Sequence, residues 1–386
     1  MPTYKRLKVA FESGSGAWLT DVNGERYLDA LSGISVCSIG HANEQVSEAL
    51  IQQAQKLTHT SNLYEIPLQE NLAYRLCKLS GLDKVFFGNS GAEANEAAIK
   101  ICRKYAQAKR IKKPVIIVMN GSFHGRTLAT LTATGNPSVQ EGYTPLLDGF
   151  HHIPYGDIDA LSRMAASDQE IVAVMLEPIL GEGGIVLPPT NYLQQVRDIC
   201  TNNSWLMVLD EIQTGMCRTG EWFSWKHSDT KPDVMTLAKA LGNSFPIGAC
   251  LASDTAAEAM VAGSHGSTFG GNPLASRVAL TVLDFMDENN LAQRAKLLGK
   301  EMFSQFQASL SDLEGVVDVR GVGLMLGIEM HKDCTELIGK ALERHLLINV
   351  TAGNVIRLLP PLIIDDVESE QIVSTVCELI KEFLSQ

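Results

Sequence analysis

A lysine ends one of the apolar runs near the middle of the chain. Residues 233–239 read DVMTLAK, which predicts a buried strand that ends at Lys239. An amine held away from bulk water has a lowered pKa, so it is neutral and nucleophilic near neutral pH. Such an amine forms a Schiff base with an aldehyde. Lys239 is therefore a candidate for covalent attachment of a carbonyl compound.

A carboxylate ends a second apolar run. Residues 204–211 read SWLMVLDE, so Asp210 stands at the mouth of a predicted strand, and Gln213 follows shortly after it. A buried carboxylate is costly unless it meets a cation or a proton. We therefore expect Asp210 to face a ligand, and a helix-capping aspartate is the simpler alternative.

The segment after a third apolar run suits an anion. KVFFG (84–88) is followed by NSGAEANE. Its Ser90, Gly91 and Ala92 are expected to open a helix, where free N–H groups and the helix dipole favour a phosphate. The ordinary alternative is a serine N-cap with Glu93 three residues later. A hydrolase nucleophile elbow, G-x-S-x-G, is discounted because Ala92 stands in place of its last glycine.

A phosphate site, a carboxylate and a Schiff-base lysine at neighbouring strand ends are what pyridoxal 5′-phosphate (PLP) requires. The carboxylate keeps the pyridine nitrogen protonated, which makes the ring an electron sink for the carbanion at the substrate carbon. The lysine holds the aldehyde. These residues therefore predict PLP as the cofactor.

These side chains need a sheet whose strands end at one edge. Short runs that are apolar on both faces alternate with helical spacing, which predicts an α/β fold with a mostly parallel sheet covered by helices on both sides. In such a sheet ligands bind at the carboxyl ends of the strands. The predicted strands are residues 84–88, 114–120, 171–178, 204–211, 233–239 and 247–253.

The remaining chain predicts a second, smaller unit. Asn23-Gly24 lies between short apolar runs and predicts a β-hairpin within residues 17–36. After about residue 275 the sequence pattern changes and predicts a long helix, followed by a glycine-bounded run, VRGVGLMLGIEM (319–330). The expected division is an N-terminal segment of the small domain (1–45), a large PLP-binding domain (46–275) and a C-terminal small α+β domain (276–386).

Composition narrows the function classes. The 386 residues carry a formal net charge of −12, which argues against nucleic acid as a partner. The eight cysteines are scattered without a C-x-x-C pair or a zinc spacing, so reduced thiols and no bound metal are expected. The chain shows neither a signal-peptide pattern nor an apolar run of membrane length. These features predict a cytoplasmic enzyme without a membrane partner.

Motifs spread over nearly the whole chain resemble those of the fold-type I, class III aminotransferases, which act on ω-amino groups. Jointly the motifs are highly specific, whereas any one alone is weak. The resemblance implies a PLP-dependent aminotransferase of fold type I that forms a homodimer with shared active sites. The motifs are SGISVCSIGH (32–41), HTSNLY (59–64), FFGNSGAEANEAAIKICRKY (86–105), SFHGRT (122–127), LEPILGEGG (176–184), LDEIQTGMCRTG (209–220), TLAKALGNSFPIGA (236–249), GSTFGGNP (266–273) and VRGVGLMLGIE (319–329).

The resemblance also implies which residues bind the cofactor. Lys239 and Asp210 are the expected catalytic pair, and Lys239 also moves a proton between the substrate carbon and the cofactor. For Thr268 an ordinary strand-end threonine is the simpler alternative. The implied set is Ser90, Gly91 and Ala92 on the phosphate, Phe123 on the ring face, Asp210 on the ring nitrogen, Gln213 on the ring hydroxyl, Lys239 on the aldehyde, and Thr268 on the phosphate of the neighbouring subunit's cofactor.

Three further residues are expected to bind substrate. Arg126 and Arg357 could each clamp a carboxylate with two hydrogen bonds, although a surface ion pair is the alternative for Arg357. The resemblance implies that Glu182 pairs with Arg357 while the amino donor reacts and releases it for 2-oxoglutarate. The resemblance is closest to family members that act in arginine biosynthesis. These enzymes move the terminal amino group of N2-acetylornithine to 2-oxoglutarate, giving N-acetylglutamate 5-semialdehyde and glutamate.

The choice of donor depends on small departures from the family pattern. Leu180 stands where glutamine is common, Cys217 where glycine is common, and Ser244 lies in a loop that is often glycine-rich. Ile34 occupies a position where ornithine aminotransferases tend to carry a tyrosine that helps bind a free α-amino acid head, and its presence favours an N-acylated donor. Succinylornithine, ornithine, N-succinyl-diaminopimelate and 4-aminobutyrate are the other candidate donors.

Other functions fit the sequence less well than transamination. Gly321-Val-Gly323 suggests a nicotinamide-binding motif, but Gly327 falls one residue late for G-x-G-x-x-G. A racemase, mutase or decarboxylase of the same fold is a further alternative. An aminotransferase needs a keto-acid acceptor, and these enzymes do not. A non-catalytic PLP-binding protein has no need for a pair of substrate arginines.

Overall fold

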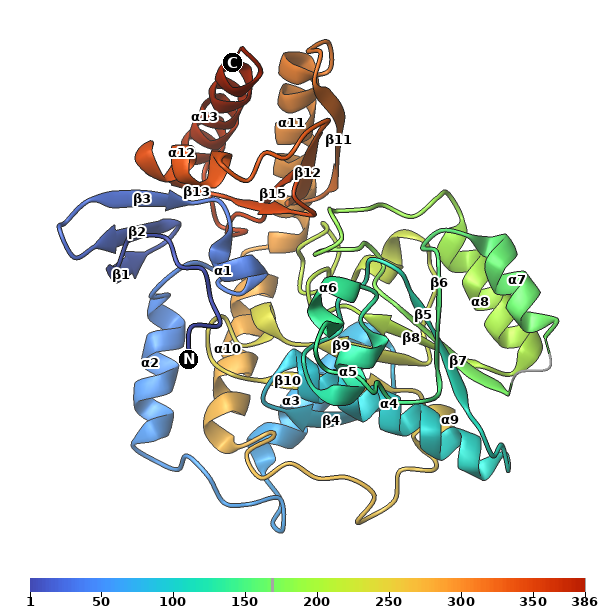
Figure 1. Ribbon diagram of the computed structural model, residues 1–386. Coiled ribbons are helices and arrows are strands. Elements are labelled where there is room, and N and C mark those ends of the chain that lie inside the picture. Colours follow the sequence, from blue (N-terminus) through green and yellow to red (C-terminus); the bar gives the residue numbers. More distant parts are fainter. Residues whose placement is uncertain (168–169, 386) are drawn as a thin grey trace.

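The computed structural model describes residues 1–167 and 170–385, and its centre is a seven-stranded sheet (Figure 1). The strand order is β4-β10-β9-β8-β7-β5-β6. Strand β10 is antiparallel to both of its neighbours, and the other pairs are parallel, so the predicted mostly parallel sheet is confirmed. The strands are β4 (Lys84–Gly88), β5 (Val115–Met119), β6 (Phe150–Ile153), β7 (Ile171–Leu176), β8 (Leu206–Asp210), β9 (Val234–Leu237) and β10 (Gly248–Ala252).

Each strand predicted for this sheet is present, with two differences. Strand β6 was missed, because its sequence FHHI places two histidines in a short run and hides the apolar pattern. Strand β9 ends at Leu237 and not at Lys239, which begins a 3-10 turn (Lys239–Leu241). The φ angle of Lys239 is +48°, and a left-handed residue cannot continue a strand.

Side chains of the sheet alternate between two hydrophobic layers, as expected for strands that are apolar on both faces. In β5, Ile116 and Val118 pack in the layer that contains α4, whereas Ile117 and Met119 pack in the larger core on the opposite face. The helices of this region are α3 (Pro67–Ser80), α4 (Gly91–Ala108), α5 (Leu128–Ala133), α6 (Pro137–Gln140), α7 (Ile158–Ala165), α8 (Tyr192–Asn203), α9 (Asp254–Ala257) and α10 (Pro273–Glu288), with a 3-10 turn at Ser224–His227.

A second sheet joins the two ends of the chain. Its order is β1-β2-β3-β13, and the C-terminal strand β13 runs parallel to β3. The predicted hairpin is β2–β3, and its turn is held by Asp21 Oδ1, which accepts hydrogen bonds from the backbone N–H of Asn23 (2.8 Å) and Glu25 (2.9 Å). The elements are β1 (Phe11–Ser15), β2 (Trp18–Asp21), β3 (Arg26–Asp29), β13 (Leu346–Leu347), α1 (Ser32–Ser35) and α2 (Glu44–Ala54).

A third sheet is antiparallel, with the order β11-β12-β15-β14. The run with Gly321 and Gly323 forms the β11–β12 hairpin, so it lacks the strand-turn-helix context that a nicotinamide-binding motif requires. The domain boundaries at residues 45 and 275 stay predictions. The elements are β11 (Val316–Val322), β12 (Met325–Met330), β14 (Asn349–Thr351), β15 (Val355–Leu358), α11 (Leu291–Leu310), α12 (Leu337–Glu343) and α13 (Asp366–Leu384).

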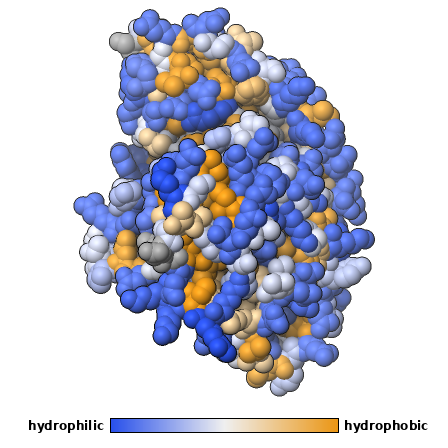
Figure 2. Space-filling view, turned by 90° about the vertical axis from the view of Figure 1, so that its right-hand side faces the viewer, coloured by the Kyte–Doolittle hydropathy of each residue, from blue (hydrophilic) through white to orange (hydrophobic). Residues whose placement is uncertain are grey.

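One face of the molecule is mostly polar (Figure 2). On the face in Figure 2 hydrophilic side chains predominate and surround a narrow hydrophobic strip. Within residues 1–167 and 170–385, no helix combines the length and apolar character needed to cross a membrane. In the same residues no His, Cys, Asp and Glu side chains cluster in a way that could hold a metal ion.

Candidate active site

A cavity of about 400 Å³ opens at the carboxyl edge of the central sheet. Its walls include the segments that follow β4, β5, β7, β8 and β9, which is the place where a parallel sheet binds ligands. Arg357 and Thr268 are the predicted site residues that do not line it. The predicted residues that do are Ser90, Gly91, Ala92, Phe123, Arg126, Glu182, Asp210, Gln213 and Lys239.

Lys239 lies in the wall of this cavity. Burial lowers the pKa of its ammonium group, although the nearby Glu182 carboxylate opposes the shift. Its left-handed backbone is uncommon for a residue with a side chain and is often found at functional sites. Among the described residues, none forms a hydrogen bond or ion pair with Lys239 Nζ. The amine is therefore free to react with a carbonyl group in the cavity.

Asp210, the last residue of β8, is 3% exposed and held by a hydrogen-bond network. Its Oδ2 accepts from Asn95 Nδ2 (2.8 Å) and faces His124 Nδ1 (2.8 Å). Its Oδ1 accepts from the N–H of Ile212 (3.1 Å), a local bond of the kind expected from the simpler capping alternative. Asn95 is fixed in turn, since its Oδ1 accepts from Thr236 (2.8 Å). The network aims an anionic group into the cavity.

Ser90 is the N-cap residue of α4, and its hydroxyl accepts from the N–H of Glu93 (3.2 Å). The N–H groups of the first helical turn have no partner within the helix, so Gly91 and Ala92 offer donors to an anion. The helix cap and the predicted phosphate site therefore coexist. Gly248 allows this arrangement, because a Cβ atom on it would lie 2.2 Å from the carbonyl oxygen of Ser90.

Arg357 lies behind Glu182 and Gln213. It is 1% exposed, which rules out the surface ion pair considered from the sequence. Its Nη1 contacts Glu182 Oε1 at 2.6 Å and Gln213 Oε1 at 3.4 Å. Burial alone raises the pKa of Glu182, but the Arg357 guanidinium outweighs it and holds that pKa below its ordinary value. Glu182 therefore covers Arg357 as a carboxylate.

The loop that carries Glu182 bridges two sheets. A β-bridge between Leu180 and Val186 closes the loop. Arg320 of β11 donates from Nη2 to the carbonyl of Gly184 (2.7 Å) and from Nε to that of Ile185 (2.8 Å). Thr351 of β14 donates to the carbonyl oxygen of Glu182. The loop is thus bonded to the sheet that also carries Arg357.

Arg126 is exposed at the cavity, and its guanidinium lies 5.6 Å from the centre of the Phe123 ring. No carboxylate of the described residues forms an ion pair with it. Thr268, in contrast, does not reach the cavity of its own chain. It is exposed and lines a separate hollow of about 470 Å³ together with Asn89 and Lys100.

Sequence reasoning missed three residues of the site, Glu177, Asn95 and His124. Glu177 follows the apolar strand β7 as Asp210 ends β8, so the same signal could have found it. Burial and the Asp210 charge raise the pKa of Glu177 to about 7. It accepts from the N–H groups of Phe123 (2.9 Å) and Gly181 (3.0 Å), so it positions both walls of the cavity.

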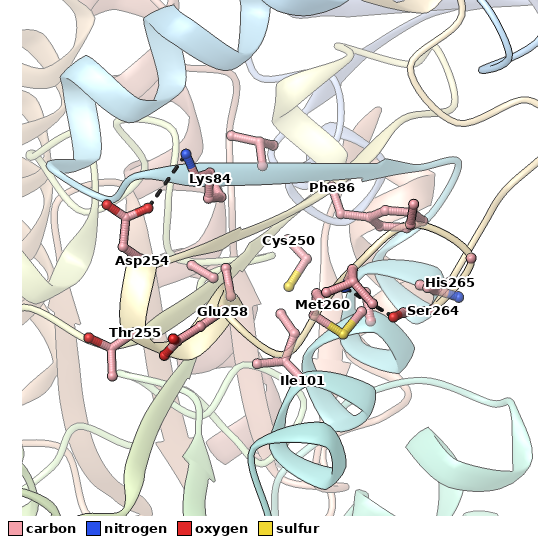
Figure 3. Close-up of a pocket in the computed structure, with 17 residues that line it drawn as sticks. Lys84, Phe86, Ile101, Cys250, Asp254, Thr255, Glu258, Met260, Ser264 and His265 are labelled. Carbon is pink, nitrogen blue, oxygen red and sulfur yellow. Dashed lines mark hydrogen bonds and ion pairs between the residues drawn. The ribbon is translucent and has the colours of Figure 1, made fainter. Parts of the chain in front are cut away.

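A larger hollow of about 720 Å³ lies elsewhere, between β4, β10, α4 and the segment after α9 (Figure 3). Its lining is mainly apolar, with Phe86, Cys250 and Met260 among the side chains. Lys84 pairs with Asp254 at 3.5 Å, and both are largely exposed. Glu258 and His265 also line this hollow, but none of the predicted site residues does.

The residues of the smaller cavity fit PLP. The α4 N-terminus supplies donors for a phosphate, Asp210 supplies an anion for a protonated pyridine nitrogen, and Lys239 supplies an amine with a lowered pKa. Phe123 adds an aromatic wall. When bound, PLP supplies an electron sink for the charge that develops at the substrate carbon.

Comparisons with known proteins agree with this chemistry. The family model described as "Aminotransferase class-III" matches residues 2–380. Acetylornithine aminotransferase of Nitrosomonas europaea is 53% identical over 384 residues, covering 100% of this chain and 98% of that protein. Acetylornithine aminotransferase of Aquifex aeolicus is 45% identical over 383 residues, covering 98% and 99%.

Solved structures give the same result. Ornithine aminotransferase of Toxoplasma gondii superposes with a TM-score of 0.96 at 33% identity, covering 99% of this chain and 92% of that one. Acetylornithine aminotransferase of Elizabethkingia anophelis superposes with a TM-score of 0.88 at 34% identity, covering 99% and 96%. This chain therefore belongs to the class III aminotransferases and is a PLP-dependent enzyme that moves an amino group from a donor to a keto acid.

Proposed function

We propose that the enzyme transfers the terminal amino group of N2-acetylornithine to 2-oxoglutarate, giving N-acetylglutamate 5-semialdehyde and glutamate, as a step of arginine biosynthesis in the cytoplasm. The observation that carries this proposal is the buried Arg357 covered by Glu182 beside the cavity that Lys239 lines. The names of the similar proteins described above support the choice of donor.

Each catalytic residue has a task that its surroundings suit. Lys239 accepts the proton from the reacting carbon and returns it during transfer, because burial keeps its amine neutral more often than that of a surface lysine. Asp210 keeps the pyridine nitrogen protonated, because the carboxylate stays fixed by Asn95 and His124. Phe123 excludes water from one face of the cavity.

The Glu182–Arg357 pair explains how one cavity accepts two unlike substrates. The donor reacts at a terminal amine that is far from its own carboxylate, so Arg126 holds that carboxylate and Glu182 keeps Arg357 covered. 2-Oxoglutarate reacts beside its α-carboxylate, and Glu182 then moves aside so that Arg357 can clamp it. Arg126 holds the other carboxylate of the acceptor, since it carries no ion pair with the described residues.

Replacing Glu182 by alanine is expected to change donor preference. The variant leaves Arg357 uncovered, so α-amino acids such as glutamate should gain at least about tenfold in reactivity relative to the ω-amine donor. Single-turnover rates with each donor measure this ratio. Glu221→Ala, which removes a partly exposed glutamate that pairs with Lys296 (3.5 Å), is the matched control. Equal slowing of both half-reactions with an unchanged donor ratio contradicts the role of Glu182.

The choice among donors is tested by mixing the purified holoenzyme with each candidate in the absence of acceptor. N2-acetylornithine is expected to give the fastest change in cofactor absorbance among the candidates. Ornithine is the second candidate, because a solved ornithine aminotransferase has nearly the same fold. The absence of a tyrosine at position 34 argues against ornithine, since Ile34 packs beside the apolar cluster of Ile179 and Met325 and offers no hydroxyl to a free α-amino acid head. A faster reaction with ornithine than with N2-acetylornithine overturns the assigned donor.

A homodimer with shared active sites is part of the proposal. Thr268 is exposed and lies in the same hollow as Asn89, the residue before Ser90 of the phosphate site. In a dimer that packs through this surface, each subunit would place its Thr268 at the phosphate site of the other subunit. Three large apolar side chains, Leu63, Tyr64 and Phe269, are exposed by 86%, 70% and 60%. Asn62 ties these two segments together by donating to the carbonyl oxygens at positions 267 and 270.

A substitution that disrupts subunit association through this surface is expected to weaken cofactor binding. Phe269→Glu places a charge in the apolar patch, so the enzyme should become monomeric and lose at least about tenfold in PLP affinity, because binding and assembly are linked. Analytical ultracentrifugation and cofactor titration measure the two effects together. Val367→Glu, at a position that is 71% exposed on α13, is the control. A monomeric Phe269 variant that keeps wild-type cofactor affinity contradicts the shared site.

A further inference from the structure

Asn349 holds one edge of the Arg357 guanidinium. The two residues are paired across the β14–β15 ladder. Asn349 Oδ1 accepts from Arg357 Nε (3.2 Å) and from Nη2 (2.9 Å). Arginine has only donors, so the amide must turn its oxygen toward the guanidinium. This double contact fixes the plane of the guanidinium in the fold.

The opposite corner of the guanidinium has a different partner. Nη1 faces Glu182 and Gln213, which both line the cavity. Among the described residues, Glu182 supplies the one carboxylate in an ion pair with Arg357. The contacts therefore divide into a neutral anchor on the sheet and a single charged partner on the cavity side.

We propose that Asn349 is a positioning residue that orients Arg357 for α-carboxylates without neutralising it. The inference rests on the proposed function, and it adds the reason why an amide stands at this position. An aspartate of the same shape could accept the same two hydrogen bonds but would keep Arg357 paired at all times. With the amide, the charge available to a substrate depends on whether Glu182 is in place. An alanine would leave the charge but release the edge that Asn349 fixes.

The test compares Asn349→Asp and Asn349→Ala with the wild-type holoenzyme. Glutarate, a non-reacting dicarboxylate, is titrated by calorimetry, and each half-reaction is followed in single turnover. Asn349→Ala is expected to weaken glutarate binding about tenfold, because Arg357 loses two hydrogen bonds. Asn349→Asp is expected to weaken it about a hundredfold, because the new carboxylate neutralises the charge of Arg357. The KM for 2-oxoglutarate should rise in parallel, while the donor half-reaction changes by less than about threefold, since its donor does not use the Arg357 charge.

A double variant separates orientation from charge. Glu182→Ala alone is expected to increase reactivity toward glutamate, and adding Asn349→Asp should cancel that gain because Arg357 is again paired. Adding Asn349→Ala should cancel it only in part. Asn354→Ala is the matched control, because Asn354 lies in the same hairpin and donates to the carbonyl of Met330 (2.8 Å), away from Arg357. It should leave the glutarate affinity unchanged even if thermal stability falls.

The outcomes distinguish this inference from the function on which it rests. A wild-type enzyme that neither binds glutarate nor uses 2-oxoglutarate overturns the proposed function, and the inference with it. If the wild type uses 2-oxoglutarate but a folded, cofactor-loaded Asn349→Asp variant binds glutarate as the wild type does, the inference alone is overturned. Equal slowing of both half-reactions in that variant also overturns it.

Discussion

Lys239→Ala is expected to lower the single-turnover rate by at least about three orders of magnitude, because one substitution removes both the nucleophilic amine and the proton carrier. The variant should still bind PLP noncovalently, since the α4 N-terminus, Phe123 and Asp210 remain in the cavity. Stopped-flow absorbance with N2-acetylornithine gives the rate, and equilibrium dialysis gives the cofactor affinity.

The control for this prediction is Lys78→Ala, which removes an exposed lysine from α3. Borohydride reduction followed by peptide mapping should place the pyridoxyl group on Lys239 in the wild type and in the control. The alanine variant should carry none. Turnover of the Lys239 variant within tenfold of the wild type, or a pyridoxyl group on another lysine, excludes the assigned role.

Asp210→Asn is expected to lower the same rate by about two to four orders of magnitude, because the substitution removes the anion that keeps the pyridine nitrogen protonated. The amide also fits its surroundings poorly. Three donors converge on the carboxylate, from Asn95, His124 and the backbone of Ile212, and an amide has only one oxygen to accept them. The cofactor absorbance spectrum should change as well, which a purely structural defect in the sheet does not require.

Asp198→Asn is the matched control, since Asp198 is an exposed carboxylate on α8 that accepts from Gln194 (2.9 Å). It should leave the rate and the spectrum unchanged. A folded Asp210→Asn enzyme with a wild-type spectrum and rate shows that the carboxylate does not serve the ring nitrogen.

The sequence was sufficient to predict six of the seven strands of the central sheet and several of the polar residues at its carboxyl edge. Buried parallel strands are short apolar runs, so polar residues such as Asp210 stand out where the runs end. Strand β6 gave no such signal, because FHHI is only partly apolar. The end of β9 was misplaced for a local reason, since nothing in TLAK reveals the left-handed backbone at Lys239.

Contacts between distant segments were beyond sequence patterns alone. Asn95 and His124 meet Asp210 only because α4 and the segment after β5 converge on the end of β8. The partners of Arg357 show the same limit, because Asn349 belongs to the third sheet and Glu182 to a loop after the first. The family resemblance supplied the Glu182–Arg357 pairing, whereas Asn349 carried no distinguishing pattern.

The loop that carries Glu182 is bonded to the third sheet through Arg320 and Thr351. A rigid-body shift of that sheet therefore moves Arg357 and the backbone of Glu182 in the same direction. Their separation then depends on rotation of the two side chains and not on the position of the third sheet relative to the central sheet. Substitutions that change how the third sheet packs against the central sheet should therefore alter turnover without changing which amine is accepted.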